Sequence, residues 1–152
     1  MQVFVASDHA GFTHKQAVLQ ALTDDGHVLT DCGAYTHDPD DDYPDFIVPA
    51  MQQLRAASTE ARAIIFGGSG QGEAMLANSF MGIRAAVYYG GAPTILTLSR
   101  AHNNANVLSL GARFMRETDA VTAARTWLRE PFSNDERHVR RLQKFPVRSK
   151  AT

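Results

Sequence analysis

A glycine-rich segment, GGSGQGE at residues 67–73, has the composition that points most directly to chemistry. Glycines let a backbone approach a ligand closely, and the free amide groups at the start of a helix attract an anion. A carboxylate beside such amides, here Glu73, can take a proton from carbon while the amides stabilise the oxyanion that forms. The segment therefore predicts an anion cradle with a general base, or a structural turn in which Glu73 complements the helix dipole.

Two better-known phosphate-binding motifs do not fit this segment. Gly68, Gly70 and Gly72 are spaced G-x-G-x-G rather than G-x-G-x-x-G, and they follow the third apolar run rather than the first. A P-loop requires lysine where Glu73 stands. The spacing therefore favours a cradle for a small molecule over a nucleotide-binding loop.

Three of the six histidines lie in unusual polar clusters: His9 in SDHAG, His102 in RAHNNAN and His138 in ERHVRR. Each one alone would more often be a structural residue, but together, close to arginines, they indicate phosphate binding and proton transfer. The sequence lacks H-x-x-x-H and H-x-H spacings, and the aspartates at 38–42 lack the glycine and terminal glutamate of a calcium loop. We therefore predict no metal site.

Charge is distributed unevenly along the chain. Fifteen basic and sixteen acidic residues leave a net charge of −1, which argues against a general nucleic-acid-binding protein. Six of the basic residues lie in the last sixteen positions, where they form either a solvated helix face or an anion site. Five aspartates crowd residues 38–45, and this composition is typical of a surface loop.

The length and composition limit the remaining possibilities. A chain of 152 residues that is 44% hydrophobic can bury the core of one domain. A single cysteine, Cys32, excludes an intramolecular disulfide and a multi-cysteine zinc site. No apolar run approaches the roughly 18 residues of a membrane span, and the N-terminal residues lack the basic segment of a signal peptide. We expect a soluble, cytoplasmic protein with no membrane partner.

Short apolar runs alternate with helical patterns, and this alternation positions the motifs. Strands are expected at residues 2–7, 27–32, 63–66, 83–88 and 105–110. Helices are expected at residues 12–25, 44–57, 73–79, 93–101, 118–129 and from about 135. This order predicts an α/β fold, a single-domain, doubly wound, Rossmann-like three-layer sandwich with a five-stranded parallel sheet. SDHAG, DCGA, GGSGQGE and LGAR would follow strands at their carboxyl ends, whereas HNNAN precedes the last strand.

These motifs, in this order, resemble the ribose-5-phosphate isomerase type B family, which includes the galactose-6-phosphate isomerase subunits. The resemblance extends from residue 3 to about residue 144. The matching segments are SDHAG (7–11), DCG (31–33), DYP (42–44), GSGQG (68–72), AN (77–78), GIRA (82–85), HNNAN (102–106), LGAR (110–113) and Arg137-His138 with Arg141. The resemblance implies an aldose–ketose isomerase of the pentose phosphate pathway that interconverts D-ribose 5-phosphate and D-ribulose 5-phosphate through an enediolate, without a cofactor or metal.

The resemblance also implies roles for individual residues. One branch of the family carries a cysteine base where Gly67 stands, and the other carries GGSG-x-GE, which this chain matches. The resemblance therefore assigns Glu73 as the base, Ser69 as its hydrogen-bonding partner and His102 as the ring-opening residue. The positions implied to contact the sugar phosphate are Asp8, His9, Tyr43, Gly68, Gly70, Gly72, Asn103, Arg113, Arg137, His138 and Arg141. The site would lie between subunits of a homodimer or homotetramer, with the basic C-terminal helix against the partner.

Several alternatives stay open at this point. Ser79 stands where the family often has lysine. The missing positive charge would change either the substrate that is accepted or the local charge pairing. The substrate could be a six-carbon aldose 6-phosphate, of allose or galactose. A non-catalytic sugar-phosphate-binding protein is also compatible with the scaffold, although it would not need Glu73, Ser69 and His102. Cys32 is predicted to be a small, buried packing residue, because Gly67 occupies the family's cysteine position.

Overall fold

Five parallel strands form one sheet in the order β2-β1-β3-β5-β4 in the computed structural model, which describes residues 1–145. The strands are β1 (Gln2–Ser7), β2 (Val28–Asp31), β3 (Arg62–Gly67), β4 (Ala85–Tyr88) and β5 (Val107–Gly111). The three central strands, β1, β3 and β5, are buried along almost their whole length. Such strands require cover on both faces, which only helices from the connecting segments can provide.

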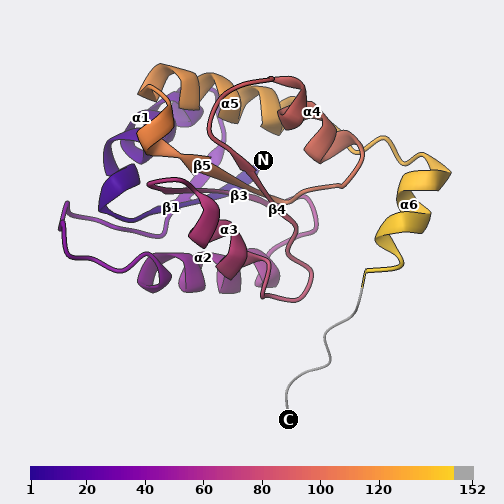
Figure 1. The fold of residues 1–152 in the computed structure, drawn as a ribbon, viewed down its shortest axis with the longest axis horizontal. Helices are drawn as coiled ribbons and strands as arrows, with labels where there is room; N and C mark the ends of the chain where they lie inside the picture. The colour runs from indigo at the N-terminus through magenta and orange to yellow at the C-terminus, as the bar shows by residue number, and fades with distance from the viewer. Residues whose placement is uncertain (146–152) are drawn as a thin grey trace, which may run out of the picture.

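Helices cover the two faces of the sheet in separate layers (Figure 1). One layer consists of α1 (Phe12–Asp24), α4 (Thr94–Ala101) and α5 (Glu117–Arg129). The opposite layer consists of α2 (Pro44–Ala56) and α3 (Gln71–Ala77). The predicted single-domain, doubly wound α/β sandwich with five parallel strands is therefore confirmed.

Two hydrophobic clusters form the core, one on each face of the sheet. Alternate residues of a strand point to opposite faces, so neighbours in sequence such as Ile64 and Ile65 enter different clusters. The first cluster joins Val5, Ile64 and Leu108 to Leu22 of α1 and Trp127 of α5. The second joins Phe4, Ile65 and Val107 to Ile47 and Met51 of α2.

Some element boundaries differ from expectation. The strand expected at residues 83–88 begins at Ala85, because the Arg84 amide donates to Asn106 Oδ1 at 2.8 Å. Helix α3 begins at Gln71, two residues before its expected start, so Glu73 lies within its first turn. Ser79 lies just beyond the end of α3, where its hydroxyl donates to the Leu76 carbonyl at 2.6 Å.

Helix α6 (Glu136–Leu142) stands away from the layers at one end of the molecule (Figure 1). It carries three of the C-terminal basic residues, whereas Arg148 and Lys150 lie outside the described residues. Within residues 1–145, no helix has the length and apolar character needed to cross a membrane.

Candidate active site

The carboxyl ends of β1, β3 and β5 bring together the first group of predicted site residues. β1 leads into the short 3-10 helix η1 (His9–Gly11), β3 into the glycine-rich loop, and β5 into η2 (Ala112–Phe114). Gly70 has a φ of +75°, and a Cβ on Gly111 would lie 2.7 Å from the Ser69 carbonyl oxygen. Glycine at these two positions therefore lets the loop lie directly against the end of β5.

The carboxyl group of Glu73 lies against the backbone of Gly67. Glu73 is only 4% exposed, and a Cβ added to Gly67 would overlap its carboxyl carbon and both oxygens. The space that a side chain at position 67 would fill is therefore taken by the Glu73 carboxyl group. A cysteine at position 67 and this carboxylate would occupy the same place in the fold.

Two buried carboxyl groups interact electrostatically here. Burial raises the pKa of Glu73 above its ordinary value, and the nearby charge of Asp8 raises it further. Burial likewise raises the pKa of Asp8, whose carboxylate caps η1 by accepting from the Gly11 amide at 3.2 Å. A carboxylate with a raised pKa is better able to accept and return a proton near neutral pH.

Arg113 lies against the glycine-rich loop, and His9 follows the neighbouring strand β1. The Arg113 guanidinium lies 3.2 Å from the position of a Cβ on Gly68, and the Arg113 amide donates to the Gly68 carbonyl at 3.0 Å. The Nδ1 atom of His9 lies 2.6 Å from Asp41 Oδ1, and this hydrogen bond raises the pKa of His9. This part of the structure thus combines the buried carboxyl group of Glu73, the Arg113 guanidinium and an imidazole whose pKa is raised.

Tyr43 and Ser69 complete this half of the site. The Tyr43 hydroxyl oxygen lies 3.1 Å from the position of a Cβ on Gly72, so the ring packs against the loop. The Ser69 hydroxyl accepts from the Gln71 amide at 3.3 Å, and no hydrogen bond joins it to Glu73 among the described residues. Its role as the partner of the base stays a prediction.

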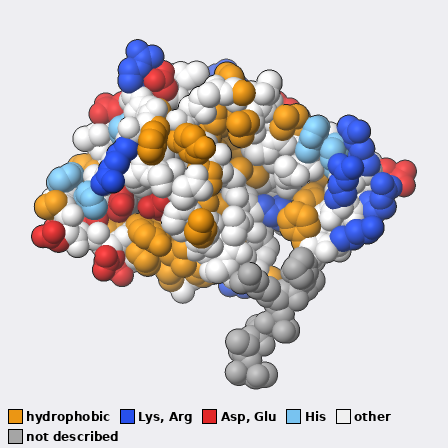
Figure 2. Space-filling view, viewed as in Figure 1, with side chains coloured by type: hydrophobic (Ala, Val, Ile, Leu, Met, Phe, Trp, Pro, Cys, Tyr) orange, Lys and Arg blue, Asp and Glu red, His pale blue; other side chains and the backbone are white. Residues whose placement is uncertain are grey.

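The second group of predicted residues lies at the other end of the molecule. His102 follows α4 and precedes β5, so five-residue β5, about 13 Å long, lies between it and Arg113. The rings of His102 and His138 are stacked with centroids 4.1 Å apart, and Arg137 Nε donates to His138 Nε2 at 3.2 Å. Figure 2 shows histidines gathered at opposite ends of one face; acidic and basic side chains both adjoin them at one end, whereas Lys and Arg predominate at the other.

Two arginines that sequence reasoning missed hold the HNNAN loop. Buried Arg100 donates to Asn104 Oδ1 at 2.9 Å and to the Ala105 carbonyl at 2.6 Å. Arg84 Nε donates to the Asn104 carbonyl at 2.8 Å. Asn103 is exposed on this loop and lines a cavity of about 660 Å³ between β4 and α6. The "GIRA" and "RAHNNAN" motifs contained these arginines, but their partners depend on tertiary contacts.

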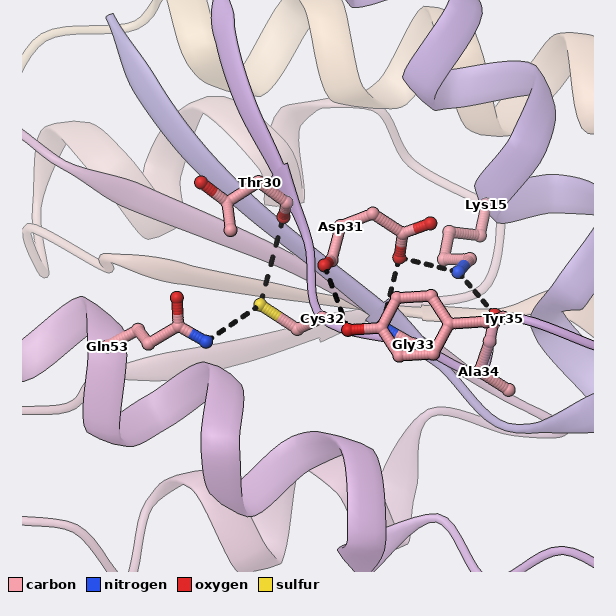
Figure 3. Close-up of polar contacts among 8 residues, drawn as sticks. All are labelled: Lys15, Thr30, Asp31, Cys32, Gly33, Ala34, Tyr35 and Gln53. Atoms are coloured by element: carbon pink, nitrogen blue, oxygen red, sulfur yellow. Dashed lines mark hydrogen bonds and ion pairs between the residues drawn. The ribbon is translucent and has the colours of Figure 1, made fainter.

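Cys32 lies beside edge strand β2, where its thiol contacts the Thr30 carbonyl at 3.7 Å and Gln53 Nε2 at 3.6 Å (Figure 3). It is 5% exposed, and burial raises its pKa to about 11. The thiol is therefore protonated at neutral pH. The prediction of a buried packing residue is confirmed.

Asp41 corrects the prediction that the acidic stretch is simply a surface loop. Its side chain is 7% exposed and faces His9, whereas Asp38, Asp40 and Asp42 are exposed. Asp8, His9 and Asp41 offer ligand atoms within 4.8 Å of one another, which is the geometry of a candidate cation site. However, the 2.6 Å contact between His9 and Asp41 is a charge-assisted hydrogen bond that leaves no room for an ion between them.

Comparisons with known proteins bear on the family and the fold. The Ribose/Galactose Isomerase family model matches residues 3–145. Ribose-5-phosphate isomerase B of Mycolicibacterium paratuberculosis is 37% identical over 93% of this chain and 87% of its own length. The corresponding protein of Mycobacterium tuberculosis (strain H37Rv) is 36% identical over 93% of this chain and 86% of its own length.

The solved structures give the same assignment. The crystal structure of ribose-5-phosphate isomerase B from Mycoplasma genitalium, with bound ribulose-5-phosphate, superimposes with a TM-score of 0.89. It is 33% identical and covers 94% of this chain and 92% of its own. By sequence and by fold, this chain belongs to the ribose/galactose isomerase family.

Proposed function

We propose that this chain interconverts D-ribose 5-phosphate and D-ribulose 5-phosphate through an enediolate, with Glu73 as the base. The observation that carries the assignment of the base is the buried Glu73 carboxyl group, held in the space left open by Gly67. The substrate follows from relatives named ribose-5-phosphate isomerase B and from a related structure with bound ribulose-5-phosphate. This activity would place the chain in the pentose phosphate pathway of the cytoplasm.

The proposed chemistry moves one proton between adjacent carbons. His102 assists opening of the furanose ring, and Glu73 then takes the proton from C2 as the electron pair of that bond forms the C1=C2 double bond. The amides of the glycine-rich loop and the Asn103 side chain stabilise the enediolate oxygens. The Glu73 carboxylic acid returns the proton to C1 while the proton of the C2 hydroxyl passes to O1, which had taken up the electron pair of the C1 carbonyl, so that C2=O forms and the ketose is complete. A general base contributes about 10²–10⁴-fold to such a step, and one oxyanion donor about 10²–10³-fold.

We further propose that two chains complete each site, in a homodimer or in a homotetramer built from such dimers. In one chain, β5 separates the half that holds Glu73 from the half that holds His102. The first half is rich in acids, and the second presents Arg137 and Arg141, which are exposed and make no ion pair among the described residues. Juxtaposing the basic half of one subunit with the loop of its partner would place base, ring-opening histidine and phosphate-binding arginines around one substrate.

The replacement Glu73→Gln tests the assignment of the base. An amide cannot accept the proton, so kcat for ribose 5-phosphate should fall by at least about 100-fold while the melting temperature changes little. Glu117→Gln is the matched control, because Glu117 is also in the first turn of a helix but is exposed. It should retain wild-type turnover.

Turnover is measured as ketose formation from ribose 5-phosphate. Allose 6-phosphate and galactose 6-phosphate are assayed separately as alternative substrates. Near-normal activity of Glu73→Gln would exclude Glu73 as the base. Preference for a six-carbon sugar would correct the substrate, and turnover of no sugar by the wild-type chain would favour a binding protein.

A further inference from the structure

Asp41 contacts His9 through two hydrogen bonds that meet at one oxygen. Its Oδ1 accepts from the His9 backbone amide at 3.0 Å and lies 2.6 Å from the His9 ring Nδ1. These atoms belong to residues 32 positions apart in the sequence, so the contact joins the loop before α2 to the end of β1. The other carboxylate oxygen, Oδ2, is buried and has no hydrogen-bond partner among the described residues.

This contact orients the imidazole ring of His9. Because Nδ1 faces Asp41, Nε2 is the ring nitrogen left to meet a ligand, and no protein partner for it is found within residues 1–145. The His9 side chain is 26% exposed, and the edge of the His37 ring contacts it with centroids 6.3 Å apart. His9 is therefore accessible, and it lies close enough to Arg113 for the guanidinium charge to affect its pKa.

The charged groups around His9 have opposing effects on its protonation. Asp41, through its hydrogen bond, and Asp8 raise the pKa of His9, whereas burial and the charge of Arg113 lower it. His37, which is exposed, contributes a second titratable ring at the same place. Without the carboxylate of Asp41, the balance would move toward the neutral imidazole.

We propose that Asp41 is a positioning residue that holds His9 as an imidazolium, with its Nε2–H directed at the phosphate of the substrate. This role rests on the proposed isomerase function and extends it to a residue that does not touch the sugar. Hydrogen bonds from a cationic donor to phosphate are about twice as strong as those between neutral groups. Asp41 would thus maintain phosphate affinity at the alkaline end of the working pH range.

The test is Asp41→Asn, which retains an oxygen that can accept from the His9 amide but removes the charge. We expect KM for ribose 5-phosphate to rise about tenfold near pH 8, where His9 then loses its proton, with kcat within about twofold of wild type. Near pH 6 the KM should return toward the wild-type value, because the imidazole protonates again. The matched control is Asp40→Asn, at the exposed neighbouring position, which should leave the KM unchanged at both pH values.

Two further measurements separate this role from a purely structural one. Histidine-selective NMR should show a lower His9 pKa in Asp41→Asn, and in a His9→Asn background the Asp41→Asn change should not raise KM further. An equal KM rise at both pH values, an unchanged KM, or an unchanged His9 pKa would overturn the proposal.

The proposal can also be judged if the isomerase assignment fails. Inorganic phosphate, titrated while the His9 ring signals are followed, should bind the wild-type chain more tightly than Asp41→Asn near pH 8. Equal affinity would overturn the role of Asp41 whether or not ribose 5-phosphate is turned over. Lack of turnover by the wild-type chain, with this affinity difference intact, would count against the isomerase function alone.

Discussion

Gly67 and Glu73 show how the absence of one side chain makes room for another. The carboxyl group of Glu73 occupies the position of a side chain at residue 67, so it is desolvated and its pKa is raised. The carboxyl group is buried against the backbone of Gly67 rather than in water, where its pKa would be lower. Both the placement and the proton affinity of the proposed base therefore depend on glycine at position 67.

Gly67→Ala should displace the Glu73 carboxyl group, because the added methyl group overlaps it. We expect turnover to fall at least about tenfold and stability to fall by about 1–3 kcal/mol, as overpacking does in other cores. Turnover assays and urea denaturation measure the two effects. In the double variant Gly67→Ala/Glu73→Ala the overlap is gone, so stability should recover while activity does not. Wild-type turnover in the single variant Gly67→Ala would contradict the proposed geometry.

The acid limb of the pH profile follows from the same residue. A base must be unprotonated, so kcat/KM should fall as the pH falls through the raised pKa of Glu73, above the ordinary glutamate value of about 4.3. Asp8→Asn preserves a side chain able to cap η1 but removes the charge that raises this pKa, so the limb should move to lower pH. A limb that does not move would show that Asp8 is not coupled to the base.

At the scale of elements, a buried ion pair anchors the loop that carries Asp41 and Tyr43. Lys15 of α1 has no exposed surface, and its Nζ lies 2.6 Å from Asp31 Oδ1 and 2.6 Å from the Ala34 carbonyl oxygen (Figure 3). The contact joins α1 to the end of β2 at the point where the loop begins. Burying an ammonium group is tolerated here because both of its partners are oxygens in direct contact.

Lys15→Met should lower the free energy of unfolding by about 3 kcal/mol, since it removes the only donor to the Ala34 carbonyl among the described residues and leaves Asp31 Oδ1 with the Gly33 amide alone. Urea denaturation measures this loss of stability. Because the Asp31 side chain is partly exposed, we expect a loss at the lower end of the range seen when one partner of a buried ion pair is removed. The control, Lys144→Met, changes an exposed lysine and should cost less than about 0.5 kcal/mol. Equal losses in the two variants would show that the pair does not stabilise the fold.

At the scale of the whole molecule, the residues proposed for the active site lie in two groups at opposite ends of one subunit. The carboxyl ends of the strands hold Glu73, His9 and Arg113, while the segment before β5 and helix α6 hold His102 and His138. The sheet between them is a packed layer, so a small conformational change cannot bring the two groups together. In the homodimer that we propose, a second copy of the chain would supply the missing group without any rearrangement.

Mixing two inactive variants tests this arrangement. Glu73→Gln and His102→Asn each remove one half of the site, so in a mixed dimer one of the two sites is free of both changes. After the variants are unfolded and refolded together in equal amounts, about a quarter of wild-type activity should return. The variants refolded separately are the control, and a mixture with no recovered activity would place both residues in sites built from a single chain.

The sequence by itself determined the order of strands and helices, since that order follows from local hydrophobic periodicity and from glycines and prolines between the elements. It also determined the chemical groups at the strand ends, because a motif such as GGSGQGE carries its chemistry in adjacent residues. Boundaries such as the start of β4 escaped prediction, because distant side chains such as Asn106 replace strand partners there.

Only the tertiary structure decided which of these groups meet. Five aspartates at residues 38–45 are equivalent in composition, and only the path of the loop turns Asp41 onto His9. In the same way, the overlap of Glu73 with the side-chain position of Gly67 depends on how β3 and α3 pack. Contacts between residues far apart in the sequence depend on the packing of whole elements, which no local pattern of residues encodes.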